Sequence, residues 1–324
     1  MPDKNTINWT AQDLNDEAVL HNKTILHMPY LELLTSLKGI QVRQGITSRE
    51  RLYRSQVDAE LAPFRPNLES DPGYKINSRD IEVHLGSLNM PFVPSEVYGK
   101  ILGDRAAKLL DGSLQDTVTA KDLLCQLGKS VGEKLVYTVW KGKYNPDGKR
   151  TLDLFDGFDT ITEKEIASGL ISEANKNLIV LSESITAQNA CDILKNEVLY
   201  KLSTQLRQQK ATIFVPQSVA DAYNDSYQYL HHNLPYNDKY EKTFLEGSNN
   251  KIEIVVVEGK EDSKFLHIAV GDELVVGCDQ VSNNERVNVG KYQPDTLTFE
   301  MRAAYGAQMA TLHYSRFCAV QLAG

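Results

Sequence analysis

The stretch Thr119–Thr160, TAKDLLCQLGKSVGEKLVYTVWKGKYNPDGKRTLDLFDGFDT, is the part around which the rest of the chain is organised. Thr119 is a good N-cap, and the apolar residues that follow it recur at spacings of three and four. These apolar residues are Leu124, Leu127, Val131, Leu135 and Val139. The spacing predicts a helix over 120–140 with one apolar stripe, about 30 Å long at about 1.5 Å per residue.

This predicted helix has a structural rather than a catalytic character, because it carries no nucleophile with a base at a workable spacing. Gly128 and Gly132 lie one turn apart, and each costs about 1 kcal/mol relative to alanine. We therefore expect a close-packed neighbour at these glycines. If the stripe is buried, Leu127→Ala is expected to cost about 2–5 kcal/mol, and the same change at Val131 somewhat less.

Three aspartates at intervals of three, Asp153, Asp156 and Asp159, follow the helix in a turn-rich segment. A calcium loop of the EF-hand type needs oxygen ligands at alternate positions and a distal glutamate, and this segment lacks both. Turn-forming acids are therefore the preferred interpretation. A metal site is the less favoured alternative, both here and at the adjacent His231 and His232.

The composition is that of a globular protein without a basic footprint. Its 324 residues, 41% hydrophobic and 24% charged, allow one large or two ordinary domains. A formal charge of −8 argues against a protein whose main task is to wrap nucleic acid. Four dispersed cysteines argue against a zinc site or a disulfide framework. With no signal peptide and no apolar run near about 18 residues, we expect an intracellular, soluble protein.

The N-terminal part predicts an arm followed by a basic excursion. Residues 1–42 are polar and end in a short apolar helix, and residues 43–80 are rich in turn residues. Between residues 38 and 57 the sequence is locally basic, because only Glu50 opposes Lys38, Arg43, Arg49, Arg51 and Arg54. Such a segment is either a solvated loop or a loop that docks on an acidic surface, because guanidinium groups suit carboxylates and phosphates. We expect a strand over 81–92 and a helix over 97–110 to follow.

The second half predicts a small α/β layer and then mostly strands. The expected elements are helices over 186–209 and 218–229 and strands over 211–216, 252–257, 265–270, 273–277, 296–303 and 309–322. Gly306 is expected to break the terminal strand, which would then pass between two sheets or two domains. The predicted fold class is α+β.

The order of these parts resembles the tailed-phage major capsid protein, whose Hong Kong 97-like fold is shared with encapsulins. The matching stretches are 127–142 with the Asn-Pro-Asp-Gly and Leu154-Phe-Asp-Gly turns that follow it, 211–221, 274–279, 296–306 and 319–322. The resemblance covers nearly the whole chain. It implies an N-terminal arm (1–42), an extended E-loop (43–88), a P domain with the long helix as its spine (89–160 with 288–309) and an A domain (161–287 with 310–324).

The resemblance also implies a function. It predicts a shell subunit, with neither enzymatic activity nor a cofactor, that assembles into hexamers and pentamers of an icosahedral head enclosing double-stranded DNA. The expected partners are further copies of the chain, a portal, a decoration protein and a separate scaffolding protein. Because only about 40 residues precede the E-loop candidate, scaffolding either comes from that separate protein or is not needed. The expected location is a virion assembled in the cytoplasm of a bacterial host, without a membrane.

Two alternatives remain open at this point. The first is an encapsulin-type shell, which has the same fold but encloses cargo enzymes instead of a genome. The second is an α+β hydrolase that uses the acids of 153–159 or the histidine pair, although no catalytic motif supports it.

The resemblance places the basic excursion over the P domain of an adjacent subunit. This P domain carries several acids in the present sequence. The expected contact residues between subunits are Arg43, Arg49, Arg51 and Arg54 on one side and Glu133, Asp153, Asp156 and Asp159 on the other.

Overall fold

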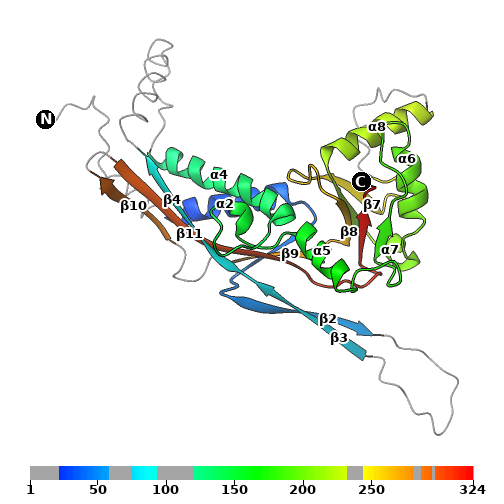
Figure 1. Cartoon of the computed structure of the whole chain (residues 1–324), viewed down its shortest axis with the longest axis horizontal. Helices are drawn as coiled ribbons and strands as arrows, with labels where there is room; N and C mark the ends of the chain where they lie inside the picture. Colours follow the sequence, from blue (N-terminus) through cyan, green and yellow to red (C-terminus); the bar gives the residue numbers. More distant parts are fainter. Residues whose placement is uncertain are drawn as a thin grey trace, which may run out of the picture.

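The computed structural model describes residues 22–57, 74–92, 120–231, 244–279, 286–293 and 296–323. It has an elongated lobe, a rounder lobe and a β-hairpin that projects away from both (Figure 1). The expected helix over 97–110 lies outside the described residues. The mixed α+β class is confirmed, since each lobe combines helices with a five-stranded sheet.

The elongated lobe is built on a sheet with β11 (Thr296–Met309) at its centre. The antiparallel partners of β11 are β10 (Arg286–Gln293), β4 (His84–Phe92) and β9 (Leu274–Asp279), and β9 pairs in parallel with β1 (Gln41–Gln44). Helices α2 (Asn22–Ser36) and α4 (Ala120–Lys141) lie side by side on this sheet (Figure 1).

The predicted long helix is confirmed as α4, and it is buried most deeply near its C-terminal end. Leu135 and Val139 are fully buried, whereas Leu127 and Val131 are only partly buried against the core. The stripe therefore contributes more to stability at its second half than at its first, because the free energy gained scales with the apolar area removed from water.

Gly132 of α4 has the close neighbour that the sequence predicts. A Cβ atom built on Gly132 would lie 2.7 Å from Cβ of Glu32 and 3.0 Å from Cα of Pro29, both in α2. Only a residue without a side chain lets the two helices approach this closely.

The rounder lobe is built on the sheet order β5-β12-β8-β6-β7. Its strands are β5 (Leu178–Val180), β12 (Phe317–Gln321), β8 (Phe265–Val270), β6 (Ala211–Val215) and β7 (Ile252–Val256). The helices packed against it are α6 (Ala190–Asp192), the π-helix η2 (Ile193–Leu199), α7 (Thr204–Gln208) and α8 (Gln217–His231).

The single helix expected over 186–209 is wrong, because three short pieces replace it. The last piece begins at Ser203, whose backbone is not helical and whose hydroxyl accepts a hydrogen bond from the backbone N–H of Leu206 to cap α7. Serine favours this capping position over the interior of a helix.

The two lobes share one continuous core at the C-terminal end of α4. The Trp140 ring lies 5.3 Å from the ring of Phe158, at the start of α5 (Phe158–Ala167), and 5.3 Å from the ring of Phe214 in β6. The short 3-10 helix η1 (Thr151–Asp153) lies in the turn-rich segment between α4 and α5. The long helix thus ends inside the rounder lobe.

Three expected boundaries are corrected by the sheets. β11 continues through Gly306 without a break, and the chain passes to the second sheet only at residues 310–316, before β12. β9, expected with the 161–287 domain, belongs instead to the sheet of β11. The strand expected over 81–92 is divided at Val83, since β3 (Tyr74–Glu82) ends before β4 begins.

Candidate assembly surface

The basic excursion is a β-hairpin, so the solvated loop considered for 43–80 is wrong for the residues described. β2 (Arg49–Val57) pairs antiparallel with β3 along its whole length, with Arg49 opposite Glu82 and Val57 opposite Tyr74. The hairpin projects well beyond the two lobes (Figure 1). Because side chains alternate along a strand, it has one face toward the body and one face away from it.

The base of the hairpin crosses the sheet of β11 at two glycines. Gly306 of β11 and Gly277 of β9 are cross-strand partners. A Cβ atom on Gly306 would lie 1.9 Å from the carbonyl oxygen of Glu82, and one on Gly277 would lie 2.9 Å from Ile46 and 3.0 Å from Ile81. We call this pair the glycine notch, because it lets the backbone of the hairpin base lie directly on the sheet.

A small apolar cluster fixes the base at the notch. Its buried members are Ile46, Leu52, Ile81, Val275 and Ala310. Leu52 and Ile81 come from the body-facing side of the hairpin, and both are at most 2% exposed. Burial of these side chains contributes roughly 1.5–3 kcal/mol each, which is enough to hold the base but not the outer part of the hairpin.

The outward face of the hairpin carries Arg49, Arg51 and Tyr53, whose side chains are more than half exposed. Both arginines bind the carboxylate of Asp80 on β3, Arg51 through Nε at 2.9 Å. These two guanidinium groups lower the pKa of Asp80, and the carboxylate in turn raises the pKa of Arg51. With Glu82 opposite Arg49, this face is charged but close to neutral.

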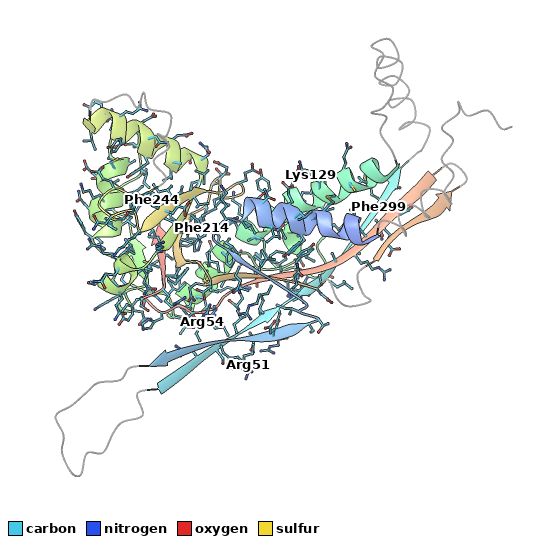
Figure 2. The ribbon with its side chains drawn as sticks, turned by 180° about the vertical axis from the view of Figure 1, so that it is seen from behind. Arg51, Arg54, Lys129, Phe214, Phe244 and Phe299 are labelled. Carbon is cyan, nitrogen blue, oxygen red and sulfur yellow. The ribbon has the colours of Figure 1, made fainter. Side chains whose placement is uncertain are left out.

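The other two predicted arginines, Arg43 and Arg54, contact groups of the same subunit. Arg43, in β1, donates to Glu50 at 3.0 Å. Arg54 donates to the side chain and the backbone oxygen of Asp272 at 2.7 and 2.8 Å. Figure 2 shows Arg54 on the side of the body and Arg51 on the side away from it.

Arg54 thereby joins an ionic cluster around the buried Glu273, in the turn between β8 and β9. Arg316 binds both Glu273 and Asp272, and its contact with Asp272 measures 2.5 Å. The Glu273 side chain is fully buried, and burial raises its pKa although Arg316 opposes the shift. A buried carboxylate needs such a partner, because an uncompensated charge is costly away from water.

The predicted acids do not form one patch. Glu133 is exposed on α4. Asp153 accepts the backbone N–H of Arg150 at 3.0 Å, and Asp156 accepts that of Tyr144 at 3.1 Å. These hydrogen bonds agree with the preferred interpretation of turn-forming acids.

Asp159 belongs to a buried cluster that the sequence did not predict. It accepts Lys260 Nζ at 3.0 Å and the hydroxyl of Ser263 at 2.6 Å, and the Lys260 side chain has no exposed surface. Lys260 also contacts His267 Nδ1 at 3.0 Å and lies 4.4 Å from the Trp140 ring centroid. Burial lowers the pKa of Lys260, and burial and the Lys260 charge lower that of His267. No local signal distinguishes Lys260 within the charged stretch EGKEDSK.

The metal site considered for the hydrolase alternative finds no support in the part of the chain that the structure covers. Among these residues, no three His, Cys, Asp or Glu side chains come together in a group that could hold a metal ion. His231 ends α8, and His232 lies outside the described residues. The described helices also include none that is long and apolar enough to cross a membrane.

Comparison with known proteins gives matches in structure only. No protein-family model matches the sequence, and neither does any curated protein. A chain of the satellite phage P4 procapsid, in a structure that includes the size determination (Sid) protein, matches with a TM-score of 0.59 at 11% identity over 93% of this chain and 90% of that chain. A chain of the cyanophage A-1(L) capsid matches with a TM-score of 0.54 at 12% identity over 91% and 92% of the two chains.

A third match, a chain of the capsid of an empty GTA particle, has a TM-score of 0.52 at 12% identity over 90% of this chain and 96% of that chain. The chain has the Hong Kong 97-like fold. Because each match covers at least 90% of both chains, the Hong Kong 97-like fold describes the chain as a whole and not one lobe of it.

Proposed function

We propose that this chain is the major capsid protein of a tailed phage or a related particle, and that it assembles into an icosahedral shell around double-stranded DNA. The observation that carries the proposal is the match of the whole chain to phage and GTA capsid chains. These matches favour a phage-type shell over an encapsulin, since all three structures are capsids by name.

We assign the parts of the fold to the expected domains in the following way. The hairpin β2–β3 is the E-loop, α4 is the spine helix of the P domain, and the β5-β12-β8-β6-β7 sheet with its helices is the core of the A domain. Residues 1–42 are the N-terminal arm, of which the structure describes α2 and the start of β1. β9 is reassigned to the P domain, because it pairs with β11.

The partners follow from this assignment. Copies of the chain form hexamers and pentamers, and a scaffolding protein, a portal and a decoration protein complete the head in the bacterial cytoplasm. The hairpin supports self-assembly on physical grounds, because a two-stranded ribbon without a core of its own is marginally stable in water. Contact with a second copy supplies the missing burial.

We expect the outward face of the hairpin to supply the guanidinium groups of the contact between subunits, and Arg49 and Arg51 are its exposed arginines. Glu133, exposed on α4, belongs to the acidic half, with Asp153 and Asp156 contributing where they remain partly exposed. Arg43 and Arg54 support the hairpin from its own body, and Asp159 is engaged by Lys260.

The test is electron microscopy and light scattering of the purified protein. We expect closed icosahedral particles from the wild-type chain, alone or with a scaffolding protein. The control replaces residues 56–75 by Asn-Gly, a two-residue turn that closes short hairpins. It keeps Arg54, Arg79 and the glycine notch, and it should give folded subunits without shells. A wild-type protein that stays monomeric under all these conditions would contradict the proposal.

A further inference from the structure

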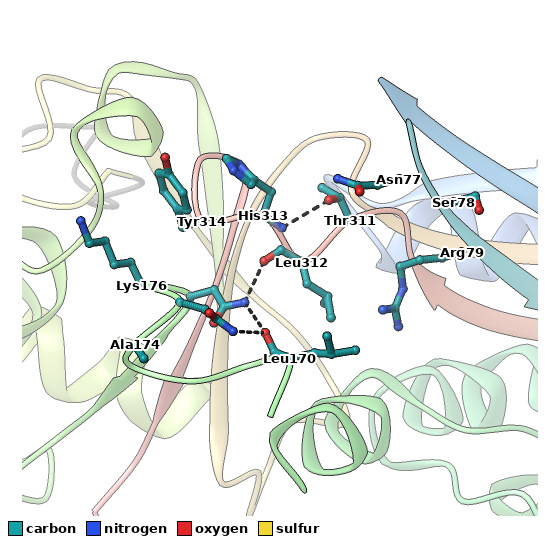
Figure 3. A pocket seen from close by; sticks show the side chains of 12 residues that line it. Asn77, Ser78, Arg79, Leu170, Ala174, Lys176, Thr311, Leu312, His313 and Tyr314 are labelled. Carbon is teal, nitrogen blue, oxygen red and sulfur yellow. Dashed lines mark hydrogen bonds between the residues drawn. The ribbon is translucent and has the colours of Figure 1, made fainter. Parts of the chain in front are cut away.

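Beyond the glycine notch and its apolar cluster, the hairpin borders an open cleft of about 800 Å³. Asn77, Ser78 and Arg79 of β3 line one side of this cleft, and residues 174–177 and 311–314 of the rounder lobe line the other (Figure 3). On the far wall, the side-chain amide of Asn177 donates to the carbonyl oxygens of Leu170 and Leu312, so its hydrogen bonds stay within the body and do not reach the hairpin. Packing therefore fixes the base of the hairpin but leaves its tilt across the cleft to other contacts.

The first such contact is Arg79, at the edge of the cleft. Its guanidinium binds Glu165 of α5 and donates to the side-chain oxygen of Gln308 in β11 at 3.1 Å. The amide nitrogen of Gln308 donates in return to the carbonyl oxygen of Asp80 at 3.1 Å. With its side chain only 18% exposed, Arg79 links β3 to two elements of the body at one point.

The second contact is Arg54, on the other strand. It binds Asp272 at 2.7 Å, in the turn between β8 and β9, where Arg316 fixes the same carboxylate. Arg79 lies opposite Leu52 across the hairpin, so Arg54 and Arg79 share its body-facing side. The two arginines reach different anchors, one beside the cleft in α5 and one in the turn after β8.

We propose that Arg54 and Arg79 are positioning residues that set the angle of the hairpin about the glycine notch. The notch and its apolar cluster act as the pivot, and two arginines on different strands with separate anchors fix the tilt that a pivot alone leaves free. They thereby determine where the far end of the hairpin meets a neighbouring copy. This last step rests on the proposed assembly function, whereas the angle itself is a property of the single subunit.

The angle is tested in the subunit by distance measurement between two spin labels. The labels are placed at Ser78→Cys on the hairpin and Glu173→Cys across the cleft, in a Cys125→Ser background, because the other three cysteines are buried. We expect a narrow distance distribution for the parent protein and a clearly broader one for Arg54→Gln and Arg79→Gln. The outward Arg49→Gln is the matched control and should stay narrow. Equal widths in all four proteins would overturn the inference.

The consequence for assembly is tested separately by microscopy of the same variants without labels. We expect Arg54→Gln and Arg79→Gln to retain the unfolding midpoint of the wild type within a few degrees but to form at least tenfold fewer closed shells, with open or irregular particles in their place. Arg49→Gln should reduce closed shells less. Normal shells from both Arg54→Gln and Arg79→Gln would overturn the role in assembly. A wild type without shells would instead contradict the proposed function and leave the spin-label result to decide the angle.

Discussion

At the scale of single residues, hydrogen bonding fixes the charge state of His267. The hydroxyl of Thr162 donates to the carbonyl oxygen of Phe158 at 2.8 Å, so it accepts from Nε2 of His267 at 2.8 Å. The proton of the imidazole therefore lies on Nε2, and Nδ1 accepts from Lys260. A second proton on this ring would face the lysine charge in a site with no exposed surface.

This arrangement predicts acid sensitivity of the folded subunit. The folded state holds the His267 pKa well below its usual value, while the same imidazole in the unfolded chain binds a proton at about pH 6.5. The contribution of His267 to stability is complete above that pH and falls as the pH decreases, by up to about 1.4 kcal/mol per pH unit. Urea unfolding at pH 7.0 and 5.5 should show a smaller loss for His267→Gln than for wild type. Equal losses of unfolding free energy in the two proteins would contradict a neutral, buried His267. As a control, the change of unfolding free energy between pH 7 and 8 should be the same in both proteins.

Gly306 gives a second prediction at this scale. A methyl group there would clash with the backbone carbonyl oxygen of Glu82, which cannot move aside by rotating as a flexible side chain could. We expect Gly306→Ala to lower the free energy of unfolding by about 3 kcal/mol or more, the upper end for overpacking. The control is Gly271→Ala, because nothing lies within 4 Å of a Cβ atom there, and it should change stability by less than about 0.5 kcal/mol. Similar values for both variants would show that the notch is not tightly packed.

At the scale of elements, burial along α4 predicts a gradient of mutational cost. Leu135 is fully buried, so Leu135→Ala should lose about 2–5 kcal/mol in urea unfolding. Leu127→Ala should lose clearly less than the 2–5 kcal/mol expected from the stripe alone, because part of that side chain stays in water. A larger loss at Leu127 than at Leu135 would contradict the burial pattern.

The elements also show what a sequence can predict. Periodicity identifies α4 within one residue of its end, and the pattern of β6 and β8 identifies those strands, because local apolar spacing determines them. The glycine notch could not be predicted, since Gly306 and Gly277 matter only through a strand 195 or more positions away in the chain. The same reason hides Lys260, whose partner Asp159 lies 101 positions earlier. In both cases the role of the residue arises only from tertiary contacts.

At the scale of the whole molecule, the charge of the hairpin is better described by its two faces than by its sum. The run of arginines predicts a basic segment, yet β3 supplies Asp80 and Glu82 opposite Arg51 and Arg49. Arg54 forms an ion pair with Asp272 of the same subunit. A triple change of Arg49, Arg51 and Arg54 to glutamate would therefore disturb two things: a contact between copies, and the contact of Arg54 with Asp272 within one copy. Substitutions at Arg49 and Arg51 test the contact between copies without removing the contact of Arg54 with the body.

The double variant Arg49→Glu, Arg51→Glu is accordingly expected to fold and to fail in assembly. Exposed ion pairs are worth about 0–1 kcal/mol each, but a shell repeats the contact at every interface. Raised salt should weaken wild-type assembly in the same direction, because the screening length falls from about 8 Å at physiological salt to about 3 Å at 1 M.

This double variant also places four acids on one face of the hairpin, and like charges directly opposite each other destabilise a strand pair. The decisive control is therefore the fourfold variant that adds Asp80→Arg and Glu82→Arg, which restores opposite charges across the hairpin with the strands exchanged. If the arginines contact a neighbouring copy, light scattering and microscopy should show that this variant folds as well as wild type but still forms few shells. Full recovery of assembly would show that Arg49 and Arg51 act only within the hairpin, and the contact between subunits would then have to lie on its other residues.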